Sequence, residues 1–192
     1  MPETRVLVTG ASGFIGGHCV LDLLNHGYRV RGSVRDPGRT PAIETMLRAH
    51  GADTGKLDWA VASLTEPGDW TAAVENCDAI FHVASPVPTI QPKNPEEVIA
   101  PTIRGTLNVL EAAAAHHIPR VILTSSVTAI LGGLSQNRVY TGDDWSDPND
   151  PAMIPYAVGK TKAEMAAWTF CESHAISLTV VHPAMVLGPA LE

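Results

Sequence analysis

The sequence has few cysteines, no long apolar run and no cluster of basic residues. Its three cysteines, Cys19, Cys77 and Cys171, lie far apart and outside any CxxC pattern, so we expect free thiols and neither a disulfide framework nor a zinc site. No apolar run approaches the roughly 20 residues that cross a bilayer. The net charge of -7 comes without the basic stripe that nucleic acids require. These absences argue against a membrane and against nucleic acid as partners.

Two further features are missing from the chain. Residues 1–5 pass directly into a strand-like run, without the basic segment, apolar stretch and cleavage site of a secretory signal, which predicts a cytoplasmic protein. The eight histidines include no HExxH pair, so we expect no metal site. What is present is a chain of 192 residues, 45% of them hydrophobic, which is enough for one domain with a real core.

Short β-branched runs alternate along the chain with helical patterns. The runs are apolar without a strict alternation of polar residues, which is typical of parallel strands buried on both faces. The sequence therefore predicts an α/β fold, a doubly wound parallel sheet. The expected strands are residues 5–9, 28–34, 58–63, 79–84, 120–125 and 178–182.

Helices are expected to cover this sheet. One follows the first strand and ends at Gly27, and another runs from Asn94 to about His117, where Pro101 should bend the helix without breaking it. Residues 131–155 are polar and rich in turn-forming residues, and an irregular segment of this length is usually functional. Because the segment directly precedes the sequence YAVGK, we expect it to be a loop on the substrate side.

The stretch VTGASGFIGG, residues 8–17, places glycines directly after the first expected strand. Gly10 permits a tight turn, Gly13 removes a side chain that would keep a phosphate away, and Gly16 lets the next helix pack closely on the strand. The pattern predicts a dinucleotide whose pyrophosphate rests on a helix N-terminus, although GxxGxxG spacing by itself is also found in plain turns. Further ligands would be the Ser12 hydroxyl and the backbone N–H groups of Phe14 and Ile15.

The end of the second expected strand, VRGSVRDPGR, indicates which dinucleotide binds. A carboxylate at this place binds the adenosine ribose 2'-hydroxyl, whereas an arginine accommodates a 2'-phosphate. Arg35 therefore favours NADP(H), and Arg39 lies near enough to assist. Asp36 stays open as a ribose ligand if the strand ends one residue later, and an exposed arginine needs no function at all.

The stretch YAVGK places Tyr156 and Lys160 one turn apart on the same face of a helix. A phenol with its ordinary pKa of about 10 is a poor acid at neutral pH. We expect the Lys160 ammonium to lower the pKa of Tyr156, so that the phenol exchanges a proton with a substrate oxygen. A serine of LTSSV, at the end of the fifth strand, would bind the same oxygen, and the pattern leaves Ser125 and Ser126 open. Such a set suits carbonyl reduction by a nicotinamide.

Seven segments, taken in order, resemble the extended short-chain dehydrogenase/reductase family, in the branch of dihydroflavonol reductases and cinnamoyl-CoA reductases. They are TGASGFIGG, VRGSVRDP, FHVASP, NPEEVIAPTIRGTLNVLEA, RVILTSS, YAVGK and VVHPAMVLGP. The resemblance implies an NADP(H)-binding Rossmann fold with a catalytic set of Ser126, Tyr156 and Lys160, and it assigns Arg35 to the 2'-phosphate. The residues it places along the nicotinamide side of the cofactor are Val83, Ala84, Ser85, Lys160, Pro183 and Val186.

The chain departs from this family at three points. Where relatives carry Asp-Leu after the third strand, against the adenine, this chain has Ser63 and Leu64. A second basic residue that some members use for the 2'-phosphate falls on Ala42, which leaves Arg39 as its substitute. Family members also continue into a C-terminal portion that closes over the substrate. Residues 1–192 are therefore expected to be a dinucleotide-binding domain and an N-terminal part of a longer reductase.

The sequence thus predicts an NADPH-dependent reductase that converts an aldehyde or ketone to an alcohol, acting on a small carbonyl compound as a monomer or a homodimer. Two alternatives stay open. The first is an NAD-dependent nucleotide-sugar epimerase or dehydratase, which shares the fold and the Tyr/Lys pair, and Arg35 weighs against it. The second is a non-catalytic dinucleotide-sensing protein, against which the retained Tyr156 and Lys160 weigh.

Overall fold

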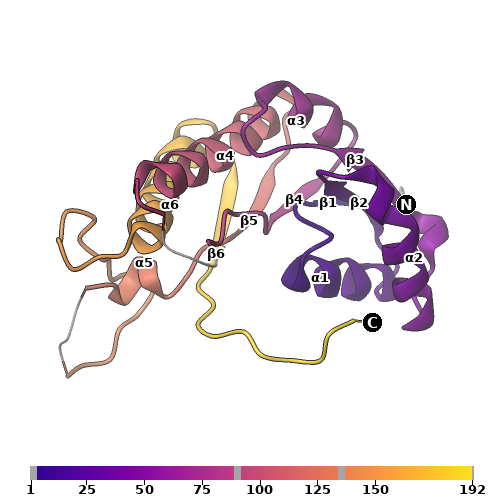
Figure 1. The fold of residues 1–192 in the computed structure, drawn as a ribbon. Coiled ribbons are helices and arrows are strands. Elements are labelled where there is room, and N and C mark those ends of the chain that lie inside the picture. Colours follow the sequence, from indigo (N-terminus) through magenta and orange to yellow (C-terminus); the bar gives the residue numbers. More distant parts are fainter. Residues whose placement is uncertain (1–3, 89–91, 134–136, 192) are drawn as a thin grey trace.

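A parallel sheet forms the centre of the molecule (Figure 1). The computed structural model describes residues 4–88, 92–133 and 137–191. Within them six strands lie in the order β3-β2-β1-β4-β5-β6, all parallel, which confirms the predicted sheet. The strands are β1 (Arg5–Val8), β2 (Arg29–Val34), β3 (Leu57–Val61), β4 (Ala79–His82), β5 (Arg120–Thr124) and β6 (Ser177–Val181).

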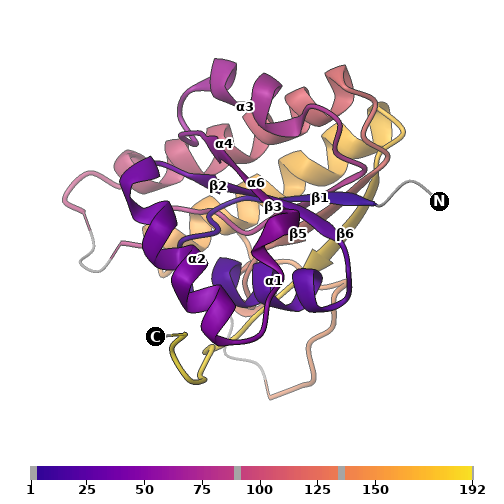
Figure 2. The same cartoon turned by 90° about the vertical axis from the view of Figure 1, so that its right-hand side faces the viewer.

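Helices cover both faces of this sheet, as Figures 1 and 2 show, and the doubly wound fold is confirmed. One face carries α1 (Phe14–Asn25) and α2 (Thr40–Ala49), and the opposite face carries α3 (Pro67–Val74), α4 (Glu96–Ala115) and α6 (Pro155–Ser173). The short elements are α5 (Thr128–Leu131) and two 3-10 turns, η1 (Pro37–Arg39) and η2 (Thr54–Lys56). None of the helices in the described ranges combines the length and hydropathy needed to cross a bilayer.

Two apolar cores lie between the sheet and its helices. Successive residues of a strand point to opposite faces. Leu7 therefore belongs to the core beneath α3, α4 and α6, while Val6 and Val8 belong to the core beneath α1 and α2. All three side chains are buried. A central strand that is buried on both faces has to be apolar throughout, which is why the sequence alone located β1.

The two long helices α4 and α6 pack against each other. Helix α4 continues through Pro101, as predicted. Gly159 of α6 lies where the two helices meet, and a Cβ at this position would stand 3.4 Å from the Cα of Ile99 on α4. A bulky side chain at 159 would push α6 away from α4, and with it the flanking Tyr156 and Lys160. The approach of these helices therefore sets the position of the reactive residues.

The segment over residues 131–155 is a loop, as predicted, and between α5 and α6 its described residues contain neither helix nor strand. Residues 134–136 of that prediction lie outside the described residues. Ser146 anchors the loop: its hydroxyl accepts a hydrogen bond from the Gly132 N–H at 2.7 Å and donates to the Thr128 carbonyl at 2.8 Å. The substrate-side role of the loop stays a prediction.

The three cysteines are free thiols, as expected. Cys77 and Cys171 are buried, and Cys19 is half-buried. Burial raises the pKa of Cys77 and that of Cys171 to about 11 each. Both groups therefore stay protonated at neutral pH and contribute as small apolar side chains.

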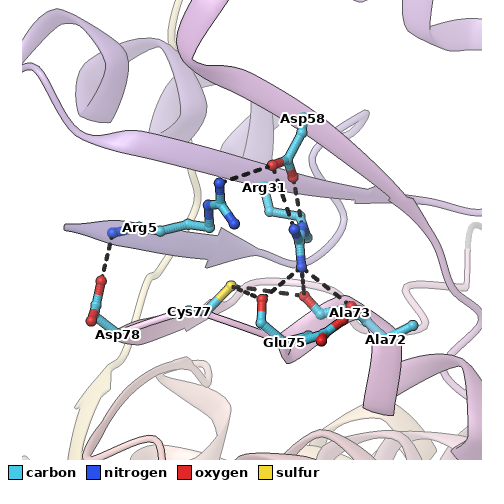
Figure 3. Close-up of polar contacts among 8 residues, drawn as sticks. All are labelled: Arg5, Arg31, Asp58, Ala72, Ala73, Glu75, Cys77 and Asp78. Atoms are coloured by element: carbon cyan, nitrogen blue, oxygen red, sulfur yellow. Dashed lines mark hydrogen bonds and ion pairs between the residues drawn. The ribbon is translucent and has the colours of Figure 1, made fainter. Parts of the chain in front are cut away.

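On the α3 face of the sheet, Arg31 joins β2 to β3 and to α3 (Figure 3). Its Nε donates to an Asp58 carboxylate oxygen at 2.6 Å, and its side chain is only 15% exposed. A guanidinium at a helix C-terminus meets both the unsatisfied carbonyls and the negative end of the helix dipole. The Arg31 Nη1 donates to the carbonyls of Ala72, Ala73 and Glu75 at the end of α3.

Replacing Arg31 by methionine should lower the free energy of unfolding by about 2 kcal/mol, because three carbonyls lose this donor and the Asp58 carboxylate keeps only its pair with Arg5 at 3.6 Å. Urea denaturation measures this loss. The matched control is Arg48→Met, which removes an exposed pair with Glu44 at 3.2 Å and should change stability by less than about 1 kcal/mol. Equal losses in the two variants would show that Arg31 contributes no more than a surface charge.

Candidate functional site

The predicted site residues gather at one edge of the sheet. All six strands run in the same direction, so the loops that follow them leave from the same edge. In Figure 1 this edge faces α5 and the C-terminal segment. The glycine-rich turn follows β1, the Tyr156 helix is α6, and the remaining candidates follow the other five strands.

The glycine-rich turn brings the start of α1 against the end of β1. Gly10 has a φ of +66°, a left-handed conformation that favours glycine, and its carbonyl accepts the Gly13 N–H at 2.9 Å. A Cβ at Gly16 would collide with the Gly10 carbonyl group, whose carbon would lie 2.8 Å away. Gly10 and Gly16 are therefore required by the close approach of helix and strand, as predicted. Gly13 is exposed at the mouth of the turn.

The first turn of α1 offers unsatisfied donors. The first helical hydrogen bond runs from the Gly17 N–H to the Gly13 carbonyl at 2.8 Å, so the amides of Phe14 and Ile15 precede the intrahelical bonding pattern. No side chain caps this helix and no acidic residue lies in its first turn. The half-buried Ser12 belongs to the same turn. This N-terminus has the unsatisfied amides of an anion site, and a Cβ at Gly13 would occupy space in front of them that glycine leaves open.

After β2, the structure distinguishes the two candidate cofactor ligands, Asp36 and Arg35, by the contacts that each one makes. Asp36 uses its carboxylate locally, because Oδ1 accepts the Gly38 N–H at 2.9 Å and caps η1. Arg35 and Arg39 are exposed, and neither forms an ion pair within the described part of the chain. The structure thus presents two guanidinium groups without a carboxylate partner beside an aspartate that is already engaged.

Ser63 and Leu64 follow β3, at the same edge. The Ser63 N–H donates to Asp69 at 2.9 Å, and the Leu64 carbonyl accepts from the Asn108 side chain of α4 at 2.7 Å. The Leu64 side chain lies directly against Gly105 of α4. Both residues are therefore fixed by the helices beside them, and contact with an adenine stays a prediction.

Thr9, which follows β1, holds the end of β4 in place. Its Oγ1 accepts the N–H groups of Val83 at 3.0 Å and Ala84 at 2.9 Å, and it lies 2.9 Å from His82 Nδ1. Because both lone pairs of Oγ1 are occupied, the hydroxyl proton goes to Nδ1. A neutral His82 then carries its proton on Nε2. Burial, assisted by the Lys160 charge, lowers the pKa of His82 to about 3, which keeps the ring neutral.

The neighbouring Ser85 is a hydroxyl in need of a partner. Its Oγ is buried and has no hydrogen-bond partner among the described residues. A buried hydroxyl without a partner costs free energy. A ligand with polar groups would satisfy it, so Ser85 fits the nicotinamide-side role that the family resemblance assigns.

The structure separates the two serines after β5. The Ser126 hydroxyl lies close enough to Tyr156 to lower the pKa of the phenol, and its Oγ accepts from the Thr128 N–H at 3.2 Å and from Thr128 Oγ1 at 3.0 Å. The Ser125 hydroxyl instead donates to Glu164 at 2.5 Å. Only Ser126 lies beside the phenol, so the geometry favours it as the catalytic serine.

Lys160 is buried next to this pair. Its Nζ donates to the Thr124 carbonyl at 2.9 Å and lies 6.0 Å from the centre of the Tyr156 ring. Burial lowers the pKa of Lys160 to about 8, against the opposing effect of the Glu164 carboxylate. The amine is therefore mostly charged at neutral pH.

The expectation that Lys160 lowers the pKa of Tyr156 is wrong for this structure. Burial raises the pKa of the phenol, and the only opposing effect is the hydrogen bond with Ser126. The reason is geometric, because the Lys160 ammonium is directed to the Thr124 carbonyl and not to the phenol oxygen.

The segment after β6 runs back toward α1, as Figure 1 shows. The Pro183 carbonyl accepts the Val127 N–H at 3.0 Å, which extends the pairing of β5 with β6 into the site. Val186 lines a cavity of about 430 Å³ that also includes Phe14 and Ile15 of α1 and Phe81 of β4. Both predicted residues of this segment therefore lie at the site edge.

A glycine-rich turn and a Ser-Tyr-Lys set on one sheet edge define the class of short-chain dehydrogenases/reductases. Residues 6–191 match the model of the NAD dependent epimerase/dehydratase family, and the chain belongs to that family. Within it, the chain is an extended short-chain dehydrogenase/reductase of the dihydroflavonol reductase and cinnamoyl-CoA reductase branch, as the resemblance predicted.

Two curated relatives illustrate this placement. The chain is 40% identical to a dihydroflavonol 4-reductase of Arabidopsis thaliana over 97% of its own length and 50% of the relative's. It is 38% identical to a cinnamoyl-CoA reductase of Medicago truncatula over 97% of its own length and 59% of the relative's. The chain thus spans about half the length of the curated relatives it matches.

Solved structures agree. Yeast methylglyoxal/isovaleraldehyde reductase, solved with NADPH, is 26% identical and superposes with a TM-score of 0.83 over 97% of this chain and 59% of that one. Vestitone reductase from alfalfa is 32% identical, with a TM-score of 0.77 over 94% of this chain and 56% of that one.

Four residues of the site edge were missed by the sequence patterns. Thr9 directly precedes the glycine of VTG, and His82 lies in FHVAS, within the apolar end of a strand. Their positions beside these motifs are the only signal in the sequence that could have identified them. Glu164 and His182 are far apart in sequence and become partners only through the fold, with His182 Nε2 at 2.9 Å from both carboxylate oxygens.

The neutral His82 should make the protein sensitive to acid. Because its folded pKa of about 3 lies below the ordinary 6.5, the unfolded chain binds a proton that the folded protein refuses, and stability falls as pH drops through this window. Between pH 6.5 and about pH 4 this one group should cost roughly 3 kcal/mol of unfolding free energy. Denaturation at several pH values measures the slope.

The variant His82→Asn keeps an acceptor for Thr9 and removes the titration, so its slope over this pH range should be flatter than that of the parent. His50→Asn, at an exposed helix end, is the matched control and should leave the slope unchanged. An identical slope in parent and His82→Asn would contradict a neutral buried ring.

Proposed function

We propose that this chain binds NADPH and reduces an aldehyde or ketone to an alcohol. The observation that carries the proposal is the placement of the Ser126 hydroxyl and the buried Lys160 amine next to the Tyr156 phenol, at the sheet edge that also carries the glycine turn. The relatives support it because those named here are reductases, and one of the solved structures holds NADPH. We further propose that residues 1–192 form one dinucleotide-binding domain.

The residues present fit the cofactor. The diphosphate would lie over Gly13, against the amides of Phe14 and Ile15, where the turn is bare of side chains. The 2'-phosphate would be held by Arg35 and Arg39, which form no ion pair with a carboxylate in the described part of the chain. The remaining contacts would come from Ser12, Ser63, Leu64, Val83, Ala84, Ser85, Pro183 and Val186.

The protein's part in the reaction is to supply a proton and to hold the carbonyl. When bound, NADPH supplies the hydride that adds to the carbonyl carbon. The Tyr156 hydroxyl donates its proton to the carbonyl oxygen, and the Ser126 hydroxyl hydrogen-bonds to the same oxygen. A raised phenol pKa keeps Tyr156 protonated before the step, and the buried Lys160 amine lies 6.0 Å from the centre of its ring.

Tyr156→Phe should reduce the turnover of carbonyl compounds by at least about 100-fold, because the proton donor is lost. The dissociation constant of NADPH, measured by fluorescence titration, should change by less than about threefold. NADPH oxidation with a panel of aldehydes and ketones measures turnover. The exposed Tyr28→Phe is the control and should match the parent. Turnover of a sugar nucleotide without net change in the cofactor would support an epimerase instead.

Arg35→Ala should weaken NADPH binding by about tenfold to 100-fold and leave NADH binding unchanged, because only NADPH carries the 2'-phosphate. Separate titrations of the two cofactors measure the ratio. Arg104→Ala, an exposed arginine of α4, is the control. If Asp36→Ala weakened NADH while Arg35→Ala left NADPH untouched, the cofactor assignment would be reversed.

A further inference from the structure

We propose that Glu164 is a positioning residue that clamps the ends of β5 and β6 to α6 and serves as the counter-charge of Lys160. This inference rests on the proposed reductase function, since the groups it holds are those of the reaction. Glu164 lies one turn beyond Lys160 and two turns beyond Tyr156 on α6, and its residue surface is 2% exposed.

Both oxygens of the Glu164 carboxylate are engaged. Oε2 accepts the Ser125 hydroxyl at 2.5 Å, and His182 Nε2 lies 2.9 Å from each oxygen. The Trp168 indole N–H reaches Oε1 at 3.4 Å. One buried carboxylate therefore connects the end of β5, the end of β6 and the next turn of its own helix.

The contact with Ser125 fixes the direction of Ser126. Ser125 and Ser126 are consecutive, so the hydrogen bond that holds Ser125 also restricts where Ser126 lies. With Ser125 held on Glu164, the neighbouring hydroxyl of Ser126 is directed to Tyr156. The two serines thus have different tasks, one structural and one at the phenol.

The contact with His182 fixes the segment after β6. The next residue, Pro183, accepts the Val127 N–H, and this segment leads to Val186. A single carboxylate therefore sets the spacing between the serine turn after β5 and the segment proposed to flank the nicotinamide.

A buried carboxylate needs a positive charge or hydrogen-bond donors nearby, and a buried ammonium needs a negative charge or acceptors. Glu164 and Lys160 each supply the opposite charge for the other. Lys160 lies in a small enclosed space with Glu164, Ser125 and His82. His82 is neutral, so it supplies no charge that could replace the carboxylate. The polar groups around Lys160 come from four elements and the residues that follow two of the strands. They are Tyr156 and Glu164 of α6, His82 of β4, Thr102 and Thr106 of α4, Thr124 of β5 with Ser125 directly after it, and His182, directly after β6, which acts through Glu164.

The test is Glu164→Gln in the full chain, which keeps the shape and removes the charge. The Lys160 amine is followed by NMR of the labelled side chain against pH, and its signal is assigned with Lys160→Met. We expect the titration of Lys160 to move to lower pH by about one unit, since the opposite charge that shares its enclosed space favours the ammonium. Glu172→Gln, an exposed residue two turns further along α6, should leave the titration where it is. An unchanged titration in Glu164→Gln would overturn the proposal.

Turnover provides a second readout. Glu164→Gln and Ser125→Ala should each lower kcat by about tenfold with little change in NADPH affinity, and the double variant should fall little further, because the first weakens and the second removes the same contact. Full kcat in Ser125→Ala would overturn the clamp even if Glu164→Gln did not fold. A parent enzyme that reduces no carbonyl would refute the proposed function, while the Lys160 titration, read without substrate, would still decide whether Glu164 holds the amine.

Discussion

A buried ammonium group is the constraint around which the carboxyl edge of the sheet is arranged. Lys160 is 6% exposed, and a cation in such a place needs acceptors and an opposite charge. The Thr124 carbonyl provides the first and Glu164 the second. Because Glu164 is itself buried, it needs donors in turn, which come from Ser125 and His182. The groups that stabilise one buried amine therefore come from α6 and from the ends of β5 and β6. Their contacts fix the relative positions of these three elements.

The same burial alters the order in which the two reactive groups lose their protons. The pKa of Lys160 falls to about 8 while that of Tyr156 rises, so the amine is the more acidic of the two. A model in which a permanently charged lysine acidifies its neighbour is therefore incomplete for this chain. Over a range of mildly alkaline pH the pair consists of a neutral amine and a neutral phenol, and the phenol keeps the proton that a reduction consumes.

Local patterns predicted most of the fold and the nucleotide turn, because those features depend on neighbours in sequence. Apolar runs located the strands, and the glycine spacing located the close approach of α1 to the end of β1, which a side chain at Gly16 would prevent. Helices α2 and α3 were not predicted, since ten and eight residues with proline at the start offer little period to detect. The Glu164–His182 pair and the role of Ser125 depend on three elements meeting, and the raised pKa of Tyr156 depends on burial. No residue spacing carries that information.

The unpaired arginines after β2 have a kinetic consequence. The chain carries a net charge of -7, yet Arg35 and Arg39 stand together without a carboxylate partner among the described residues. Two such charges on a chain of negative net charge attract anions that diffuse nearby. Association of a phosphorylated ligand at this point therefore slows as ionic strength rises, since added salt shortens the reach of the two charges to about 8 Å under physiological conditions.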